Sequence, residues 1–278
     1  MSIKIKDIIV HVIKSDLDVP FAFSQGWVTK RSATLVEIIT NDGLTGWGEA
    51  FCQGLEPPEI SGAVIETALK PLLIEQSPLN IEVLWYKMYN ATRDFGRKGS
   101  VVSGISAVDI ALWDILGKYH NQPIHQLLGG AFRTNIKPYA TGFYRIHGQG
   151  EAKRLAEEAL LHYENNFDHM KIKLGFGIKD DIKCMEAIYD VIENKNVTLM
   201  IDTNHAYGRS EALILGKALK DYNLRWYEEP VVPEDIQGYK ELKSKLDVPI
   251  AGGENEHTLY GFRSLFENRA IDIAQPDI

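Results

Sequence analysis

The sequence has little cysteine and no long uncharged apolar run. Its 278 residues include only two cysteines, Cys52 and Cys184, which excludes a disulfide framework and favours a reducing, cytoplasmic location. We find no stretch of about 18 apolar residues of the kind that spans a membrane, and the N-terminus lacks the apolar core of a signal peptide. Acidic residues outnumber basic ones by 38 to 30. This balance argues against nucleic acid or an anionic membrane as a partner.

The composition is that of a folded globular chain, with 45% hydrophobic and 24% charged residues. At roughly 150 residues per domain, the length suggests two domains or one large barrel. Before residue 130, strand-like segments come first and helical ones follow, which predicts an α+β domain over 1–130. A loop is expected at 15–29, and loops of this length are often functional. The strand-like segments are 3–13, 33–40 and 44–49, and the helical ones are 60–69, 81–88 and 100–118.

After residue 130 short apolar runs alternate with helical segments. This alternation predicts an α/β domain over 131–278, with a parallel sheet and right-handed crossovers. The predicted strands are 136–140, 169–174, 198–201, 224–227, 248–251 and 270–275. The predicted helices are 151–165, 180–193, 209–221, 234–245 and 258–268.

A polar residue stands at the C-terminal end of five successive predicted strands. The intervals between them are 29, 26, 26 and 23 residues, and each suits one βα unit. A single acid after a strand usually caps a helix or an Asx turn, but five in register favour a functional site, because active sites of (β/α) barrels lie on that face. The five residues are Lys173, Asp202, Glu228, Glu254 and Asp277.

Three carboxylates from adjacent strands repel one another unless positive charge lies between them. Oxygen ligands without Cys or His are typical of a hard cation such as Mg²⁺, which makes Asp202, Glu228 and Glu254 candidate ligands. An acid pair of the glycosidase kind is the alternative, but it leaves the lysines unexplained. Lys171 and Lys173 share one strand face. Two such ammonium groups beside a metal should have lowered pKa values, which would make a lysine a base near neutrality.

The motifs K-I-K, D-T-N, E-E-P, G-G-E-N and Q-P-D-I, in this order and spacing, resemble the mandelate racemase branch of the enolase superfamily. The resemblance covers essentially the whole chain, including the helix at 106–114 and the Leu-Leu-Gly-Gly break at 127–130. It implies an N-terminal capping domain over a TIM-type (β/α) barrel. It also implies Mg²⁺ held by Asp202, Glu228 and Glu254, with Lys173 as the base that removes a proton α to a substrate carboxylate.

The same resemblance implies further roles. Lys171 would help neutralise the carboxylate, Asn204 would touch the substrate or order the site, and Asp277 would orient a histidine on the next strand. Capping-domain loops near 15–29 and 51–59 would close over the substrate, and the polar residues Ser24 and Gln25 there suit a hydroxylated one. The residues expected at the substrate are Asn204, His205, Trp27 and Gln53.

The chain also departs from the family pattern. Only six barrel strands are predicted where eight are needed, and the histidine partner of Asp277 is absent from the 278 residues. We therefore expect an incomplete, truncated barrel with impaired turnover, and a homo-oligomer formed through open sheet edges.

The activity predicted from the resemblance is dehydration of a sugar acid, with loss of the C2 proton and the 3-hydroxyl. Segments 96–99, 139–142 and 238–243 resemble the acid-sugar dehydratases of the family more than its cycloisomerases. Racemisation or epimerisation of a 2-hydroxy acid is the enzymatic alternative. A non-catalytic protein that keeps the fold is the alternative from a different class.

Overall fold

The computed structural model describes residues 2–52 and 55–277. The chain forms two compact units, and each is discontinuous in sequence. The first unit holds the chain up to Asp18 together with Val28–Asn135. The second holds Val19–Trp27 and Ile136–Asp277.

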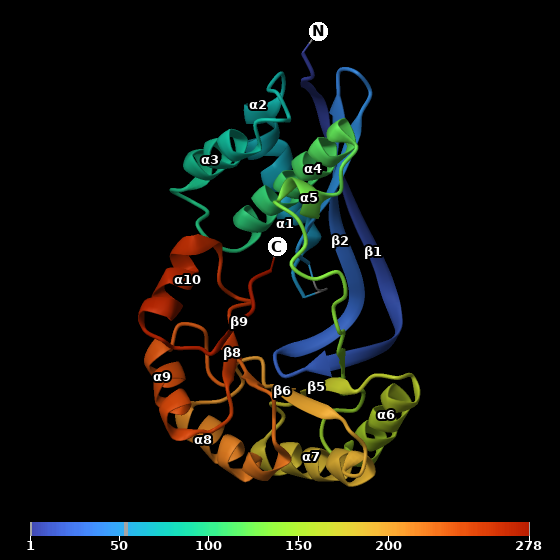
Figure 1. The fold of residues 1–278 in the computed structure, drawn as a ribbon, viewed down its shortest axis with the longest axis vertical. Helices are drawn as coiled ribbons and strands as arrows, with labels where there is room; N and C mark the ends of the chain where they lie inside the picture. Colours follow the sequence, from blue (N-terminus) through green and yellow to red (C-terminus); the bar gives the residue numbers. More distant parts are fainter. Residues whose placement is uncertain (1, 53–54, 278) are drawn as a thin grey trace. The chain divides into compact units, whose positions relative to one another are not determined.

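An antiparallel sheet in the order β1-β2-β3 begins the chain (Figure 1). Its strands are β1 (Ile5–Phe23), β2 (Gly26–Thr40) and β3 (Thr45–Ala50). The turn Asn41-Asp42-Gly43 joins β2 to β3, and Ile38 pairs with Gly46 across them. The strand-like segments predicted at 33–40 and 44–49 thus pair as a hairpin.

The loop predicted at 15–29 is wrong, because β1 and β2 continue through most of this segment to a turn at Ser24 and Gln25. Val19, Phe21 and Phe23 occupy every second position and therefore share one face of the strand. Pro20, which suggested a loop, is tolerated because β1 is an edge strand of the sheet. The segment thought to be irregular is therefore a hairpin arm.

Helices complete the first unit, and the longest packs tightly on the sheet. Glycines in β3 allow this approach: a Cβ on Gly48 would lie 2.0 Å from the carbonyl oxygen of Ala107, and one on Gly46 would lie 2.2 Å from that of Ala111. Buried side chains of the sheet and helices form one apolar core. The helices are α1 (Pro58–Val64), a π-helical turn (Ile65–Leu69), α2 (Lys70–Leu73), α3 (Ile81–Thr92), α4 (Ser100–His120) and α5 (Ile124–Leu127).

Helix α4 is long and apolar enough to cross a membrane by length and composition, the one such helix in residues 2–52 and 55–277, with a mean hydropathy of 1.5. Its Val108, Leu112 and Ile115 are fully buried in the core of the first unit. The central helix of a globular core meets the same criteria.

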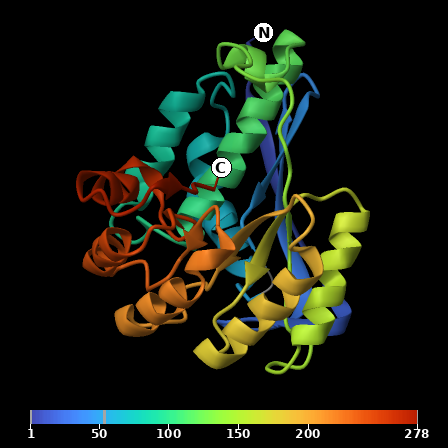
Figure 2. The ribbon, with the colours of Figure 1, turned by 60° about the horizontal axis from the view of Figure 1, so that its bottom comes forward.

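The second unit contains six parallel strands that neighbour one another in chain order, β4-β5-β6-β7-β8-β9. Helices follow the strands and lie on one face of the sheet (Figures 1 and 2). The predicted α/β architecture with six parallel strands is confirmed. The strands are β4 (Ala140–Gly142), β5 (His169–Lys173), β6 (Thr198–Asp202), β7 (Tyr227–Glu228), β8 (Ile250–Gly252) and β9 (Ile273–Ala274); the helices are α6 (Ala152–Glu164), α7 (Ile178–Ile192), α8 (Arg209–Ala218), a 3₁₀ turn (Lys220–Tyr222), α9 (Ile236–Lys245) and α10 (Thr258–Glu267).

Strand boundaries differ most at the two ends of this sheet. The strand predicted at 136–140 begins only at Ala140, because Ile136 is exposed and has no place in the core. The last predicted strand, 270–275, is reduced to β9. The inner strands agree within a few residues, and β5 and β6 are buried on both faces along almost their whole length.

Strand register brings the polar strand ends to one level. Lys173 of β5 pairs with Asp202 of β6, and Asp202 pairs with Glu228 of β7. Glu228 pairs in turn with Ala251 of β8, three residues before Glu254. Parallel pairing therefore places side chains from four consecutive βα units at one edge of the sheet.

Candidate metal and proton-transfer site

Three carboxylates meet at the C-terminal ends of β6, β7 and β8. One oxygen from each of Asp202, Glu228 and Glu254 lies within 4.8 Å of the others. Asp202 and Glu228 are fully buried, and Glu254 is partly buried. A set of carboxylate oxygens with no nitrogen or sulfur donor fits a hard divalent cation such as Mg²⁺.

Two buried lysines complete the cluster. Lys171 Nζ lies 2.5 Å from Glu228 Oε1 and 3.3 Å from Asp202 Oδ2. Lys173 Nζ donates to Asp202 Oδ2 at 2.5 Å. Both side chains are therefore inside the unit and not on a solvated edge.

The pKa values of the lysines differ from the sequence-based expectation. Burial lowers the pKa of Lys171 and Lys173, but nearby carboxylates, chiefly Asp202, raise it more, so both pKa values lie above the ordinary range. The expected decrease applies to lysines beside a bound metal and stays a prediction. In the arrangement described here, the charges and hydrogen bonds of the carboxylates outweigh burial. The lysines are counter-ions of the acids here.

Negative charge still exceeds positive charge in the cluster. Burial, and then the charge of Asp202, raises the pKa of Glu254 to about 7 and also raises the pKa of Glu228. Two ammonium groups thus do not fully stabilise three carboxylates. A divalent cation at this point would supply the missing positive charge.

Asn204 connects the lysines to the acids. Its side-chain oxygen accepts a hydrogen bond from Lys173 Nζ at 2.9 Å, and its amide donates to Glu254 Oε1 at 3.2 Å. Its main-chain N–H donates to Asp202 Oδ1 at 2.8 Å. The residue has φ of 41°, a left-handed conformation that asparagine adopts more readily than most residues.

Two residues that the sequence analysis did not assign hold Glu228. Trp226 Nε1 donates to Glu228 Oε2 at 2.9 Å, and Gln275 Nε2 donates to the same oxygen at 2.8 Å. Trp226 lies in the strand predicted at 224–227. The two-residue spacing from Glu228 was the available signal, because residues i and i+2 of a strand share a face.

The hairpin tip contacts the loop after β6. Ser24 Oγ donates to the Thr203 carbonyl oxygen at 2.8 Å, and Gln25 Nε2 donates to the Asn204 carbonyl oxygen at 2.6 Å. Ala22 and Arg145 exchange main-chain hydrogen bonds in the same unit. The two polar side chains expected to suit a substrate therefore bind main chain in this structure.

The remaining predicted site residues take no part in the hydrogen bonds of the cluster, as far as residues 2–52 and 55–277 are concerned. His205 is partly buried, and burial lowers its pKa. Trp27 is 49% exposed in β2, and Asp277 is exposed beyond β9. Gln53 lies outside the described residues.

Two family models match this chain. The mandelate racemase/muconate lactonizing enzyme N-terminal domain matches residues 5–129, and the enolase C-terminal domain-like family matches residues 151–278. The chain belongs to the enolase superfamily, in its mandelate racemase/muconate lactonizing enzyme branch.

Individual relatives within that branch are similar over most of the chain. D-galactarolactone cycloisomerase of Agrobacterium fabrum is 38% identical over 99% of this chain and 71% of that protein. Arabinonate dehydratase of Saccharolobus solfataricus is 37% identical over 87% of this chain and 64% of that protein. The crystal structure of 3,6-anhydro-D-galactonate cycloisomerase from Zobellia galactanivorans matches with a TM-score of 0.88 and 40% identity over 99% of this chain and 72% of that one.

The chain therefore spans between 64% and 72% of the length of these relatives. A more distant relative bears on the metal. The crystal structure of L-talarate/galactarate dehydratase from Salmonella typhimurium is liganded with Mg, and it matches with a TM-score of 0.90 and 27% identity over 99% of this chain and 71% of that one.

Proposed function

We propose that the protein is a Mg²⁺-dependent enzyme that removes the proton α to the carboxylate of a sugar acid and eliminates the 3-hydroxyl as water. The observation that carries this proposal is the cluster of Asp202, Glu228 and Glu254 oxygens within 4.8 Å, next to two buried lysines. The names of related proteins, a sugar-acid dehydratase and sugar-acid cycloisomerases, support the substrate class.

Each residue of the cluster has a role in the proposal. Asp202, Glu228 and Glu254 hold the cation, which supplies positive charge that stabilises an enediolate. Lys171 offsets the charge of the substrate carboxylate. Lys173 accepts the α-proton at Nζ.

Lys173 can accept a proton only in its neutral form. Asp202 favours the charged form here, so the proposal requires that Asp202 be engaged elsewhere, as a metal ligand is. Burial and the ammonium group of Lys171 then both favour the neutral form of Lys173. Asn204, which accepts from Lys173 Nζ at 2.9 Å, keeps the amine oriented.

Cycloisomerisation is the second candidate function, because two cycloisomerases match this chain at 38% and 40% identity. Both reactions can share the α-proton removal and the cleavage of a C–O bond at C3. A free 3-hydroxyl takes up a proton and leaves as water, whereas an oxygen that closes a ring takes up a proton and stays attached, so the product is an isomer. The identities do not separate the two, since the dehydratase matches at 37%. The predicted greater similarity of three segments to dehydratases stays a prediction.

One assay tests the proposal and its alternatives. Sugar acids of different stereochemistry, with their lactones and anhydro forms, are incubated with the protein and Mg²⁺ in D₂O, with a chelated sample and Lys173→Ala as controls. A product that has lost one oxygen as water supports dehydration, and a keto product that keeps every oxygen of the substrate supports ring opening. Deuterium exchange with inversion and no C–O cleavage supports an epimerase. No Mg²⁺-dependent exchange on any substrate would support the non-catalytic alternative and overturn the proposal.

Assembly and location are further parts of the proposal. A homo-oligomer and a cytoplasmic location stay predictions. Light scattering after size-exclusion chromatography measures the oligomeric state.

A further inference from the structure

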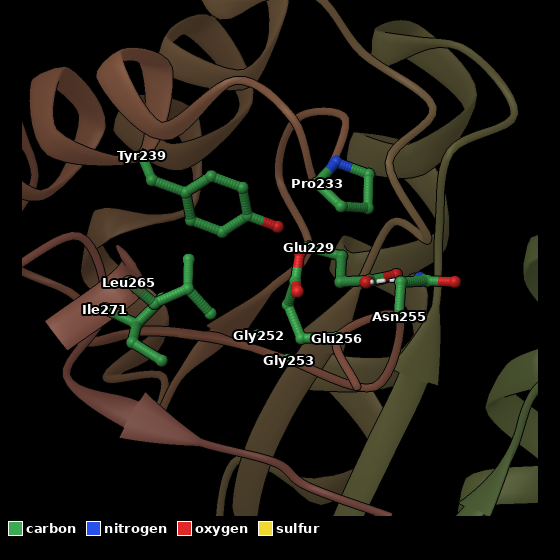
Figure 3. Close-up of a pocket in the computed structure, with 9 residues that line it drawn as sticks. All are labelled: Glu229, Pro233, Tyr239, Gly252, Gly253, Asn255, Glu256, Leu265 and Ile271. Carbon is green, nitrogen blue, oxygen red and sulfur yellow. Dashed lines mark hydrogen bonds between the residues drawn. The ribbon is translucent and has the colours of Figure 1, made fainter. Parts of the chain in front are cut away.

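A fourth buried carboxyl lies beside the three candidate ligands. Glu229 directly follows Glu228, and only 1% of it is exposed. Its Oε1 accepts a hydrogen bond from Asn255 Nδ2 at 2.7 Å (Figure 3). Asn255 directly follows Glu254. The hydrogen bond therefore joins the residues next to two candidate ligands, across the loops after β7 and β8.

The main chain of Glu229 is bonded to both neighbouring βα units. Its N–H donates to the Ala251 carbonyl oxygen at 3.0 Å, and its own carbonyl oxygen accepts from His205 N–H at 2.8 Å and from Thr203 Oγ1 at 2.9 Å. These contacts lie next to β6 and β8. Glu229 thus connects the three segments, at the C-terminal ends of β6, β7 and β8, that carry the candidate ligands.

The other carboxyl oxygen of Glu229 lacks a protein partner. Within residues 2–52 and 55–277, no donor contacts Oε2. Glu229 lines a cavity of about 10 Å³, together with Tyr239 and Gly253, and in Figure 3 the Tyr239 hydroxyl points towards Glu229. A cavity of this size is at the lower limit for one water molecule.

The buried Glu229 carboxyl lowers the stability of the fold, since burying an unpaired polar atom such as its Oε2 costs free energy. An apolar residue would avoid this cost but could not accept the Asn255 hydrogen bond. The hydrogen bond to Asn255 is therefore an interaction of the Glu229 side chain that an apolar side chain cannot make.

We propose that Glu229 is a positioning residue: its hydrogen bond to Asn255 sets the spacing of Glu228 and Glu254, and so raises Mg²⁺ affinity without contact to the metal. The inference rests on the proposed function, in which these carboxylates hold Mg²⁺. Partners of metal ligands typically change metal affinity by about 10–100-fold when they are removed.

The test is a Mg²⁺ titration of the whole chain by calorimetry, with unfolding curves to verify that each variant folds. Glu229→Leu and Asn255→Ala should each weaken binding by about 10-fold or more, and the double variant should be no weaker than the weaker single one. Glu229→Gln keeps an acceptor for Asn255 and should bind Mg²⁺ almost as the native protein does. Asn255 is exposed, so Asn255→Ala and Glu229→Gln carry the test if Glu229→Leu does not fold.

Tyr239→Phe is the matched control, because it changes the same cavity and leaves the Glu229–Asn255 bond in place. Its Mg²⁺ affinity should stay native. An equal loss in Tyr239→Phe, native affinity in Asn255→Ala, or multiplied losses in the double variant would each overturn the inference. If the native protein binds no Mg²⁺, or binds it equally well as Asp202→Asn, the proposed function itself fails.

Discussion

Asn204 accepts a hydrogen bond from Lys173 Nζ at 2.9 Å through its side-chain oxygen. The ammonium group can only donate, so the amide oxygen must face it and the amide nitrogen must face Glu254, where it donates at 3.2 Å. One amide thus links the proposed base to a proposed metal ligand. In the proposed function, this side chain would couple proton transfer to metal binding.

The two acids of the E-E-P motif should differ sharply in metal binding. Glu228→Gln should weaken Mg²⁺ binding by more than the roughly 10–100-fold typical of a lost outer partner, because a charged ligand is lost. Glu229→Gln should have little effect, since it keeps its acceptor for Asn255. Calorimetric titration measures both, and equal losses would count against Glu228 as the ligand.

The proposed base should control α-proton exchange. Lys173→Ala should slow exchange by about 10²–10⁴-fold, the usual effect of a positioned acid or base. Lys171→Ala should raise KM as well, because its proposed role is to offset the substrate carboxylate. Exchange is followed by NMR in D₂O. Near-native exchange in Lys173→Ala would place the base elsewhere, and His205 would be tested next.

The indole of Trp226 should stabilise the metal-binding form of Glu228. Trp226→Phe keeps an aromatic ring and removes the donor that lies 2.9 Å from Glu228 Oε2. We expect about 10-fold weaker Mg²⁺ binding, measured by the same titration. Trp85→Phe, in α3 of the first unit, is the control and should bind normally. Unchanged affinity in Trp226→Phe would show that Gln275 alone is sufficient.

The stability of the first unit should depend on the protonation of Asp109. Burial, and then the charge of Glu82, raises the pKa of Asp109 to about 6. Because its native pKa is raised, Asp109 stabilises the fold most when it is protonated. Its contribution to the free energy of unfolding therefore falls as pH rises from its ordinary pKa of 3.8 towards 6. Asp109→Asn should therefore raise the unfolding temperature at pH 8 and change it little below pH 4.

Thermal unfolding at several pH values measures this difference. Glu82→Gln serves as a companion variant, because it removes the second cause and should produce a smaller rise at pH 8. A rise that is the same at every pH would attribute the effect of Asp109→Asn to packing.

Close packing of α4 on β3 should make Gly48 hard to replace. A Cβ at this position would lie 2.0 Å from the carbonyl oxygen of Ala107, and a backbone atom cannot rotate away. Gly48→Ala should lower the free energy of unfolding by at least about 1–3 kcal/mol. Gly62→Ala is the control, because its nearest neighbour would be a Val10 methyl group at 3.3 Å. Chemical denaturation measures both, and similar values would contradict the packing argument.

The cluster of acids could be predicted from sequence because its geometry follows from repeated local patterns. Each inner strand is a short apolar run with a polar residue at its end. Parallel register then aligns those ends, as in the pairing of Asp202 with Glu228. The position of Lys171 and Lys173 at the end of β5 could be predicted for the same reason.

Contacts between distant segments could not be predicted in this way. Ser24 and Thr203 are 179 positions apart, and no periodicity relates them. The direction of the lysine pKa shifts also depends on which carboxylate each ammonium group contacts. The hairpin arm that contains Pro20 could not be predicted either. A proline is compatible with a strand only at the edge of a sheet, and the sequence does not show which strand lies at an edge.

The discontinuity of the second unit has a consequence for recombination between relatives. Val19–Trp27 belong to the second unit by their contacts, although they precede most of the first unit in the sequence. A chimera joined at residue 135 would inherit the donors of Ser24 and Gln25 from one parent and the Thr203 and Asn204 carbonyls from the other. Compatibility of these two short segments, more than similarity of whole domains, would then decide whether the loop bearing Asn204 keeps its left-handed conformation in the hybrid.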